Sequence, residues 1–446
     1  MHQKKQWQKF AAHFLIIFLP LGMIFSAFLY YIYTTEKSAD FKVLATDSRS
    51  QVNRNFTAIS KDYTSISSDL MMISKMHEMK KIFEGNRSDI HDLESDLLSL
   101  SSIKKMYDQV RYLDESGSEI LRINYNRGSP ELVPAENLQN KAQRYYFEDT
   151  FSLNEGEIFV SPLDLNIENG KIETPLKPVV RIGTPVFSST GEKRGVLLLN
   201  FFGNIIINKL QNFGGENASQ FSFLNSQGYW LKGPDAKDEW GFMYDEKQDR
   251  TFGNKYPEAW ATINAYDYGQ FKNQNGLFTY KTLYPLSEYH NSSTGTPQPY
   301  EPSSAKVEQD QYYFKIVSHV PASVIQQRTQ NISNNLLRLY ALLIILSFTI
   351  SWISAHYSEL KYRMEIQSKK LIQDLQKAVE EVQTLQDILP ICSYCKNIRN
   401  DDGYYEKLEG YFHKNSGVDF SHTICPECLK NQYPDIYEGM VADKKI

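Results

Sequence analysis

Two long apolar stretches, one near each end of the chain, constrain the fold more than any other feature. Residues 10–33 and 336–355 contain no Asp, Glu or Lys, and Arg338 is the one Arg. Helices of these lengths rise about 36 Å and about 30 Å, enough to cross the hydrocarbon core of a bilayer. The first stretch is also too long for the apolar part of a typical signal peptide. We therefore predict two transmembrane helices that flank a long polar region.

The positions of Lys and Arg predict which side of the membrane each part faces. Basic residues precede the first span and follow the second: Lys4, Lys5, Lys9, Lys361, Arg363, Lys369 and Lys370. By the positive-inside rule both termini are cytoplasmic and residues 34–335 are extracytoplasmic. The four cysteines agree with this topology because all lie in the last 55 residues, in the compartment that keeps thiols reduced.

Composition excludes some classes of protein. With 53 acidic and 48 basic residues the formal net charge is −5, a bias too small to indicate a nucleic-acid partner. The mean hydropathy of −0.46 excludes a polytopic transporter. A length of 446 residues is consistent with about three domains.

Residues 34–104 begin with the pattern of a long amphipathic helix, a stalk that rises from the membrane. Apolar residues recur in steps of four and three: Val52, Phe56, Ile59, Tyr63, Ile66, Leu70 and Ile73. We expect Asn86 to interrupt the stalk and a second helix to follow through Leu93, Leu97, Leu100 and Ile103.

Beyond residue 104 the pattern changes to strands, which predicts an α+β fold. Strands are expected over residues 107–114, 118–125, 157–161, 179–187 and 195–202, with helices over 135–151 and 203–213. This order fits one mixed antiparallel sheet with flanking helices.

A weak internal repeat predicts that one hairpin is used twice. The segment YLDESGSEI, residues 112–120, aligns without gaps to FLNSQGYWL, residues 223–231. A strand over 311–319 is expected to close this second lobe. Residues 290–307, rich in Ser, Pro and Thr, are expected to form an exposed loop.

Several segments of this region resemble the double Cache, or tandem PAS-like, sensor domains of bacterial membrane receptors. They are SEILRINYN, QNKAQRYYFEDT, EIFVSPLDLNIENGKIE, PLKPVVRIGTPVF and GEKRGVLLLNFF. The resemblance covers roughly residues 36–330. It implies a bacterial inner-membrane receptor with a membrane-distal lobe, residues 105–213, that holds a small ligand. A membrane-proximal lobe, residues 214–330, would couple to the second span.

Four residues are candidates for the pocket that this resemblance implies. Arg144 and Tyr146 lie on or beside the expected pocket helix, and Asp164 and Arg181 are expected to face them from the sheet. Fixed charges and an aromatic wall suit a charged ligand. The alternative is that Arg144 and Asp164 only pair with each other or cap loops. Amino-acid-binding members hold the ligand amine with an aromatic-x-Asp step; residues 159–161 are Phe-Val-Ser, which argues against an amino acid.

Residues 358–389 carry the heptad pattern of a coiled coil. The apolar positions are Met364, Leu371, Leu375, Ala378, Val382, Leu385 and Leu389. A chain already held on a membrane can dimerise through so short a seam, so we predict a parallel homodimer. The alternative is a single helix packed on the tail.

Residues 390–446 contain two Cys-x-x-Cys pairs separated by 29 residues. They are Cys392 with Cys395 and Cys425 with Cys428. Four thiolates at this spacing predict a structural Zn²⁺ in a zinc-ribbon-like module, and the metal would supply much of the folding free energy of so small a segment. Iron is the weaker alternative, because rubredoxin-like knuckles usually have Gly after the second Cys. Here Lys396 and Leu429 stand there.

This tail, residues 386–434 above all, resembles a cysteine-rich module found at the ends of bacterial sensory and response-regulator proteins. That resemblance implies a signalling context and no reaction. The expected ligands do not include His413 and His422, because four cysteines already complete a tetrahedral set.

No kinase, cyclase or phosphodiesterase motif is found in the sequence. We therefore expect a non-enzymatic receptor that acts on an unidentified cytoplasmic signalling protein. The alternatives are a truncated or orphan sensor histidine kinase or a kinase partner, and a tail that itself responds to metal or redox state.

Overall fold

The computed structural model describes residues 2–84, 90–168, 170–212, 219–296, 301–386 and 388–442. The chain divides into two units, described in turn. One comprises Met1–Met23 with Ile344–Ile446, and the other is Ile24–Leu343.

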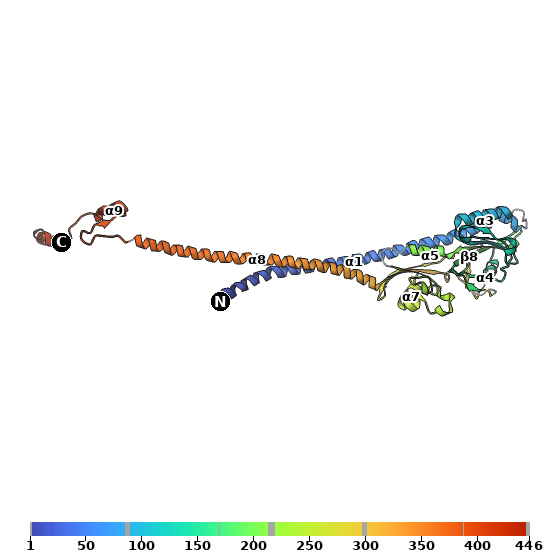
Figure 1. Ribbon diagram of the computed structural model, residues 1–446. Coiled ribbons are helices and arrows are strands. Elements are labelled where there is room, and N and C mark those ends of the chain that lie inside the picture. The colour runs from blue at the N-terminus through green and yellow to red at the C-terminus, as the bar shows by residue number, and fades with distance from the viewer. Residues whose placement is uncertain are drawn as a thin grey trace. The chain divides into compact units, whose positions relative to one another are not determined.

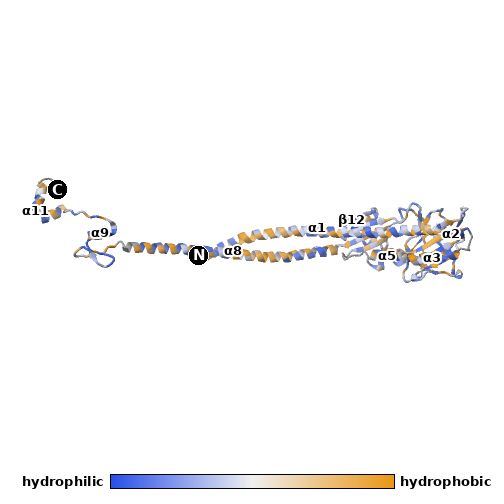
Figure 2. Cartoon of the chain, turned by 90° about the horizontal axis from the view of Figure 1, so that it is seen from above, coloured by the Kyte–Doolittle hydropathy of each residue, from blue (hydrophilic) through white to orange (hydrophobic). Residues whose placement is uncertain are grey.

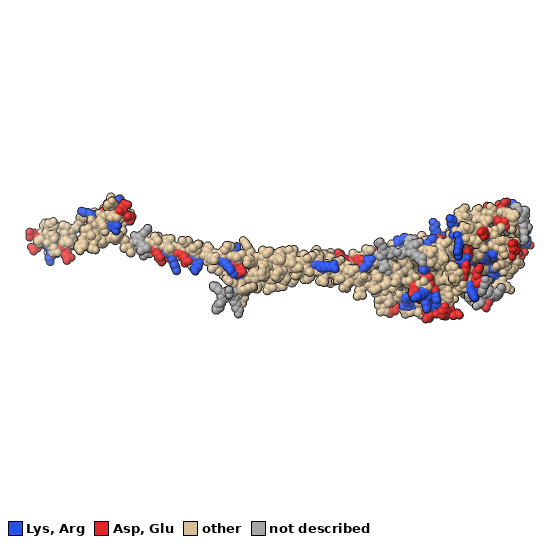
Figure 3. Space-filling view, in the orientation of Figure 1, with Lys and Arg blue, Asp and Glu red and all other residues tan. Residues whose placement is uncertain are grey.

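Two long helices contain the predicted spans. Helix α1 (His2–Ser74) continues from the first span into the stalk, and α8 (Ala322–Gln386) continues from the second span into the predicted coiled coil. Each is long and apolar enough to cross a membrane. Their apolar stretches are orange in Figure 2, and Figure 3 shows few charged side chains there.

In the first unit the two helices pack against each other through aromatic rings. The ring of Phe10 lies 5.1 Å from that of Trp352, and Phe14 lies 5.3 Å from Phe348. Because residue numbers rise along α1 as they fall along α8, the two spans are antiparallel.

The stalk helix ends earlier than its sequence indicates. Helix α1 stops at Ser74, and the backbone at Met76 is extended, with φ −59° and ψ 144°. Helices α2 (His77–Phe83) and α3 (Ile90–Lys104) follow. The predicted uninterrupted helix up to Asn86 is therefore wrong. Asn86 itself lies outside the described residues.

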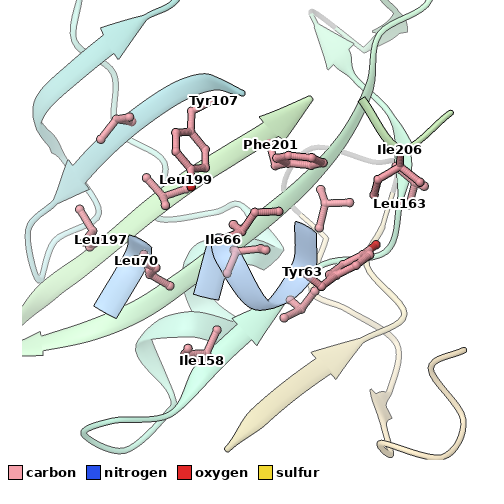
Figure 4. Close-up of a cluster of buried hydrophobic side chains, with 14 of the residues drawn as sticks. Tyr63, Ile66, Leu70, Tyr107, Ile158, Leu163, Leu197, Leu199, Phe201 and Ile206 are labelled. Atoms are coloured by element: carbon pink, nitrogen blue, oxygen red, sulfur yellow. The ribbon is translucent and has the colours of Figure 1, made fainter. Parts of the chain in front are cut away.

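The predicted apolar stripe of α1 is confirmed. Its seven residues all belong to, or pack on, the main core, and Ile59, Ile66 and Ile73 are fully buried. Figure 4 shows Ile66 and Leu70 beside Leu197 and Leu199 of strand β9 (Lys193–Phe202). Burying Leu or Ile side chains to this extent stabilises a fold by about 1.5–3 kcal/mol each. Leu93 and Leu97 of α3 join the same core, so α3 packs on the distal lobe.

The distal lobe is built on a nine-stranded sheet, mostly antiparallel. Its order is β15-β14-β4-β8-β9-β1-β2-β3, with β5 paired to β8. The strands from the distal segment are β1 (Tyr107–Leu113), β2 (Glu119–Asn124), β3 (Glu131–Leu132), β4 (Ile158–Val160), β5 (Asp164–Leu165), β8 (Pro178–Phe187) and β9 (Lys193–Phe202). A separate hairpin joins β6 (Ile167–Glu168) to β7 (Lys171–Ile172). Helices α4 (Tyr145–Phe151) and α5 (Gly203–Asn212) flank the sheet. The predicted α+β class is confirmed.

The helix predicted over residues 135–151 forms only at its ends. A 3₁₀ turn covers Ala135–Asn137, and α4 begins at Tyr145. Between them the Asn140 amide donates to the Ser116 carbonyl and its oxygen accepts from the Ala142 N–H. Such local bonds compete with the helix and tie this segment to the β1–β2 hairpin.

The repeated hairpin is confirmed in detail. In the first copy the Asp114 side chain accepts the N–H groups of Ser116 and Ser118, and Gly117 has φ 75°. In the second copy the Asn225 side chain accepts the N–H groups of the residues at the same two positions, and Gly228 has φ 83°. An Asx residue and a left-handed glycine therefore define both turns.

The proximal lobe has a five-stranded sheet of order β11-β10-β16-β13-β12. The strands are β10 (Gln220–Asn225), β11 (Trp230–Lys232), β12 (Tyr268–Asn273), β13 (Gly276–Leu283) and β16 (Phe314–Pro321). The strand predicted over residues 311–319 is the central strand β16, which leads directly into α8. The helices are α6 (Phe252–Lys255) and α7 (Pro257–Ala265), with 3₁₀ turns at Ala236–Asp238, Gly241–Met243 and Asp245–Lys247. A further 3₁₀ turn, Asn126–Gly128, lies between β2 and β3 of the distal lobe.

The described parts of residues 290–307 are only partly the exposed loop that was expected. They contribute β14 (His290–Ser293) and β15 (Lys306–Val307), and β14 pairs in parallel with β4 of the distal sheet. Ser292 and Ser293 are buried, and their hydroxyls donate to the Val160 carbonyl and to Asp149, each at 2.6 Å. Satisfied hydrogen bonds allow serines to enter a core.

The tail contains short elements. They are β17 (Ile398–Arg399), β18 (Tyr405–Glu406), α9 (Leu408–Ser416), α10 (Pro426–Gln432) and α11 (Pro434–Ala442). Strands β17 and β18 form a two-stranded hairpin directly after the first cysteine pair.

Candidate functional site

The candidate site is centred on Tyr146 in the first turn of α4. This helix forms where consecutive aromatic residues meet the sheet: Tyr145, Tyr146 and Phe147 are all buried in one cluster with Phe159. The residue before the helix, Arg144, has an extended backbone with φ −101° and ψ 130°. The helix start therefore places a cation beside a buried phenol.

The structure brings together all four residues predicted for the pocket. The guanidinium groups of Arg144 and Arg181 lie 5.6 Å and 5.4 Å from the centre of the Tyr146 ring, within cation–π range. Arg181 is on β8, and it bonds Asp164 of the neighbouring strand β5 at 3.1 Å and Asn166 at 3.0 Å. Asp164 is thus paired with Arg181, whereas the alternative was a pair with Arg144.

Sequence reasoning missed three residues of the site. Arg111, from β1, donates to the Tyr146 hydroxyl at 3.3 Å and lies 3.7 Å from Glu119. Its Nε is buried and has no hydrogen-bond partner among the described residues. Lys141 lies close enough to Tyr146 to affect its ionisation. A single Arg inside the otherwise apolar Val-Arg-Tyr-Leu run of β1 was the available signal.

We call Arg111, Lys141, Arg144 and Arg181, grouped around Tyr146, the distal basic cluster. Two carboxylates offset part of its positive charge. Asp164 pairs with Arg181. Glu119 pairs with Arg111 at 3.7 Å and with a further cation, Arg122, at 2.8 Å. Five cations and two carboxylates leave an excess of three positive charges in a largely buried region.

The ionisation of the site reflects this imbalance. Burial opposes ionisation of Tyr146, but the surrounding cations outweigh it and lower the pKa of the phenol. Burial lowers the pKa of Lys141, and Arg111 and Arg144 add to the effect. Burial also raises the pKa of Asp164, although Arg181 acts against it. The site therefore favours negative charge at its centre.

Ser161, the last residue of the Phe-Val-Ser step at 159–161, has a structural role. Its hydroxyl accepts the N–H of Arg181 at 2.8 Å, and its carbonyl accepts the Tyr312 hydroxyl at 2.7 Å. Tyr312 lies two residues before β16. A chain of hydrogen bonds thus leads from the distal site to the strand that continues into α8.

Each cysteine pair in the tail forms a tight turn. In the first, the N–H of Lys396 donates to the Cys392 carbonyl at 3.0 Å, and Lys396 adopts the left-handed conformation, φ 59°, for which knuckles usually have Gly. The N–H groups of Cys395 and Tyr394 lower the pKa of Cys392. In the second, the N–H of Cys428 reaches the Cys425 sulfur and lowers its pKa. Each turn thus favours one thiolate, as metal binding needs, whereas the Cys425 side chain raises the pKa of Cys428.

The two pairs are not assembled into one centre. Within the described residues no group of three or more His, Cys, Asp or Glu side chains is arranged to hold a metal ion. His413 bonds Asp419 at 2.6 Å. Each pair fits half of a tetrahedral thiolate site, and zinc remains a prediction.

Comparison with known proteins identifies the sensor. A family model described as the sensor domain of bacterial histidine kinases matches residues 43–293, more than half of the chain. The chain belongs to this family. No match was found among curated proteins.

Two solved structures show the fold of this histidine kinase sensor. The extracellular domain of vpHK1S-Z8, assigned as a histidine kinase, is 18% identical with a TM-score of 0.52, and the match covers 64% of this chain and 98% of that one. A domain of a sensory box/GGDEF family protein from Vibrio parahaemolyticus is 19% identical with a TM-score of 0.51 and the same coverage. The predicted Cache-like extracytoplasmic sensor is confirmed. With its two candidate spans, the chain is an inner-membrane protein.

Proposed function

We propose that this sensor binds a small anionic molecule at the distal basic cluster and relays its presence across the membrane. The observation that carries the proposal is the excess of three positive charges around Tyr146. Arg144 forms no ion pair with any described residue, and the Arg111 Nε, although 3.7 Å from Glu119, forms no hydrogen bond with the described residues. Buried donors left unsatisfied cost about 1–3 kcal/mol each, which a ligand oxygen would recover.

Arginine and tyrosine also suit the geometry of an anion. A guanidinium can donate two parallel hydrogen bonds to a carboxylate or phosphate, and a phenol adds a third donor. Both carboxylates of the cluster are already paired, Asp164 with Arg181 and Glu119 with Arg111 and Arg122. A cationic ligand would meet no free counter-charge there.

The route to the membrane runs through the proximal lobe. The Tyr312–Ser161 bond joins the distal site to β16, which passes without a loop into α8. Strand β14 adds a second link by pairing with β4. Ligand binding can shift such an equilibrium only by its difference in affinity for the two states, typically about 1–3 kcal/mol.

On the cytoplasmic side we propose a homodimeric coiled coil followed by a zinc-bound docking module, with both termini in the cytoplasm. Support for the dimer comes from exposed seam residues of α8: Met364, Leu371, Leu375 and Val382 are 55–61% exposed in the single chain. Leu389, assigned to the seam, lies beyond the end of α8, and the Leu385 side chain is not among those described. The shift of α8 would then present or hide a surface for a signalling protein.

A thermal-shift screen of residues 36–333 tests the proposal. Small carboxylates and phosphate esters are compared with neutral analogues of the same size, and the best anion is tested again on Arg144→Ala. We expect stabilisation by one or more anions that the substitution abolishes. Stabilisation by neutral analogues alone, or an unchanged shift in Arg144→Ala, would contradict the proposal.

The family favours one alternative output, in which the protein is part of, or a partner for, a histidine kinase. Co-purification of a kinase with the full chain, and ligand-dependent phosphorylation in that complex, would support it. If zinc itself is the signal, the tail must exchange metal at cellular concentrations, and retention with subpicomolar affinity would exclude that role.

A further inference from the structure

A cavity of about 730 Å³ lies where α1 and α8 leave their apolar stretches on the sensor side. Its walls come from α1, the start of α8 and the turn between β12 and β13, and they include Lys37, Lys272 and Asn273. We call it the juxtamembrane pocket. Tyr30 and Tyr33 line both this pocket and an adjoining groove of about 410 Å³ between the two helices. This interspan groove is otherwise largely apolar.

The juxtamembrane pocket carries net positive charge. Its one acidic lining residue among those described, Asp40, pairs with Arg328 at 2.9 Å. Lys37 and Lys272 form no ion pair with the described residues. Their ammonium groups lie 5.6 Å from the Tyr33 ring and 5.3 Å from the Phe41 ring. The Asn273 amide nitrogen is shielded from solvent and has no hydrogen-bond partner among the described residues.

We propose that the juxtamembrane pocket and the interspan groove together bind one anionic phospholipid. The phosphate would accept hydrogen bonds from Lys37, Lys272 and the Asn273 amide, and an acyl chain would lie in the groove between the spans. Tyrosines at a membrane interface and lysines just outside it match the depth of the glycerol backbone and the headgroup. The groove continues this arrangement into the hydrocarbon region, and Leu29, Leu336 and Leu337 in its lining offer an acyl chain apolar contacts.

Such a lipid would touch α1, the β12–β13 turn and α8 at once. It would therefore favour one relative position of the proximal lobe and the output helix, whichever molecule the distal lobe binds. Anionic lipid content would then set the resting state of the receptor.

The test measures lipid binding to the full chain in detergent by native mass spectrometry. Phosphatidylglycerol is compared with phosphatidylcholine of the same acyl chains and with glycerol 3-phosphate. The variant is Lys37→Gln/Lys272→Gln, and the matched control is Lys42→Gln, an exposed α1 lysine that does not line the pocket. At about 1 kcal/mol per lysine, we expect the double variant to bind phosphatidylglycerol about 30-fold more weakly and the control to be unchanged.

The comparators separate the possible occupants. Tighter binding of phosphatidylglycerol than of both comparators supports the proposal. The proposal is overturned if phosphatidylcholine or glycerol 3-phosphate binds as tightly as phosphatidylglycerol. It is also overturned if the double variant binds phosphatidylglycerol as tightly as the wild type. Ser26→Trp, which fills the groove, should also weaken lipid binding. If it instead leaves lipid binding unchanged and dissociates a dimer, the groove holds a second copy of the chain and the proposal fails.

Discussion

Arg181 and Arg144 lie over the same tyrosine ring, yet removing Arg181 should reduce stability whereas removing Arg144 should not. Arg181 is 5% exposed and provides the only ion pair of Asp164 among the described residues. Its replacement in Arg181→Ala leaves a carboxylate whose side chain is 19% exposed without a counter-charge. Breaking a buried pair from one side costs about 3–5 kcal/mol. Partial access of water to Asp164 reduces the expected cost to about 2–4 kcal/mol.

Thermal unfolding of residues 36–333, followed by circular dichroism, measures this cost. For a domain of this size we expect the melting temperature to fall by about 3–6 °C. Adding Asp164→Asn removes the orphaned charge and should restore a substantial part of the loss. A melting temperature within about 2 °C of the wild type, or a double variant no more stable than the single one, would refute the assignment of Arg181 as the partner that stabilises Asp164.

Three further predictions follow from the site, the proximal core and the tail. Arg144→Ala should leave the melting temperature nearly unchanged, because Arg144 forms no ion pair with the described residues, yet weaken anion binding about 10- to 100-fold, measured by calorimetry. His319 is buried against Phe278, and burial lowers its pKa. Below about pH 6.5 the unfolded chain therefore binds more protons than the folded chain, and the free energy of unfolding decreases as the pH is lowered. His319→Phe should therefore flatten the pH dependence of the unfolding free energy between about pH 6.5 and 5. Cys392→Ser should abolish stoichiometric zinc and unfold the tail without affecting membrane insertion, whereas His413→Ala should retain the metal.

Each of these has an outcome that contradicts it. Equal anion affinity in Arg144→Ala would remove that residue from the site. An unchanged pH slope in His319→Phe, with the exposed His91→Asn as control, would assign the slope to other groups, such as His290, whose pKa burial also lowers. A tail equally folded without metal would overturn the zinc prediction.

The elements that the sequence predicts well are those whose signals are local. The turns at Asp114 and Asn225 need an Asx residue and a glycine three positions later, and both are visible in the sequence. The apolar stripe of α1 is equally predictable from the sequence, because one face of this long helix packs against a single hydrophobic core. The pairing of Arg181 with Asp164 was not predicted, because it depends on the short strand β5 lying beside β8.

What the sequence did not reveal depends on contacts between distant segments. Strand β14 joins β4 across more than 130 residues, and only that partner turns a Ser-rich stretch into a buried strand. In the sequence Arg111 is an isolated charge within the strand β1. Its place in the site depends on its hydrogen bond to the Tyr146 hydroxyl, which α4 positions in the folded chain. The break of α1 after Ser74 has no glycine or proline to mark it.

The central claim is that an anion bound outside the membrane moves the output helix inside the cell. The most direct measurement is the distance between spin labels at Leu371 of two full-length chains in a lipid bilayer, recorded with and without the anion identified in the screen. We predict that the anion changes this distance in the wild type and leaves it unchanged in Arg144→Ala. A wild-type chain that binds the anion at the distal site with no change in this distance would contradict the account.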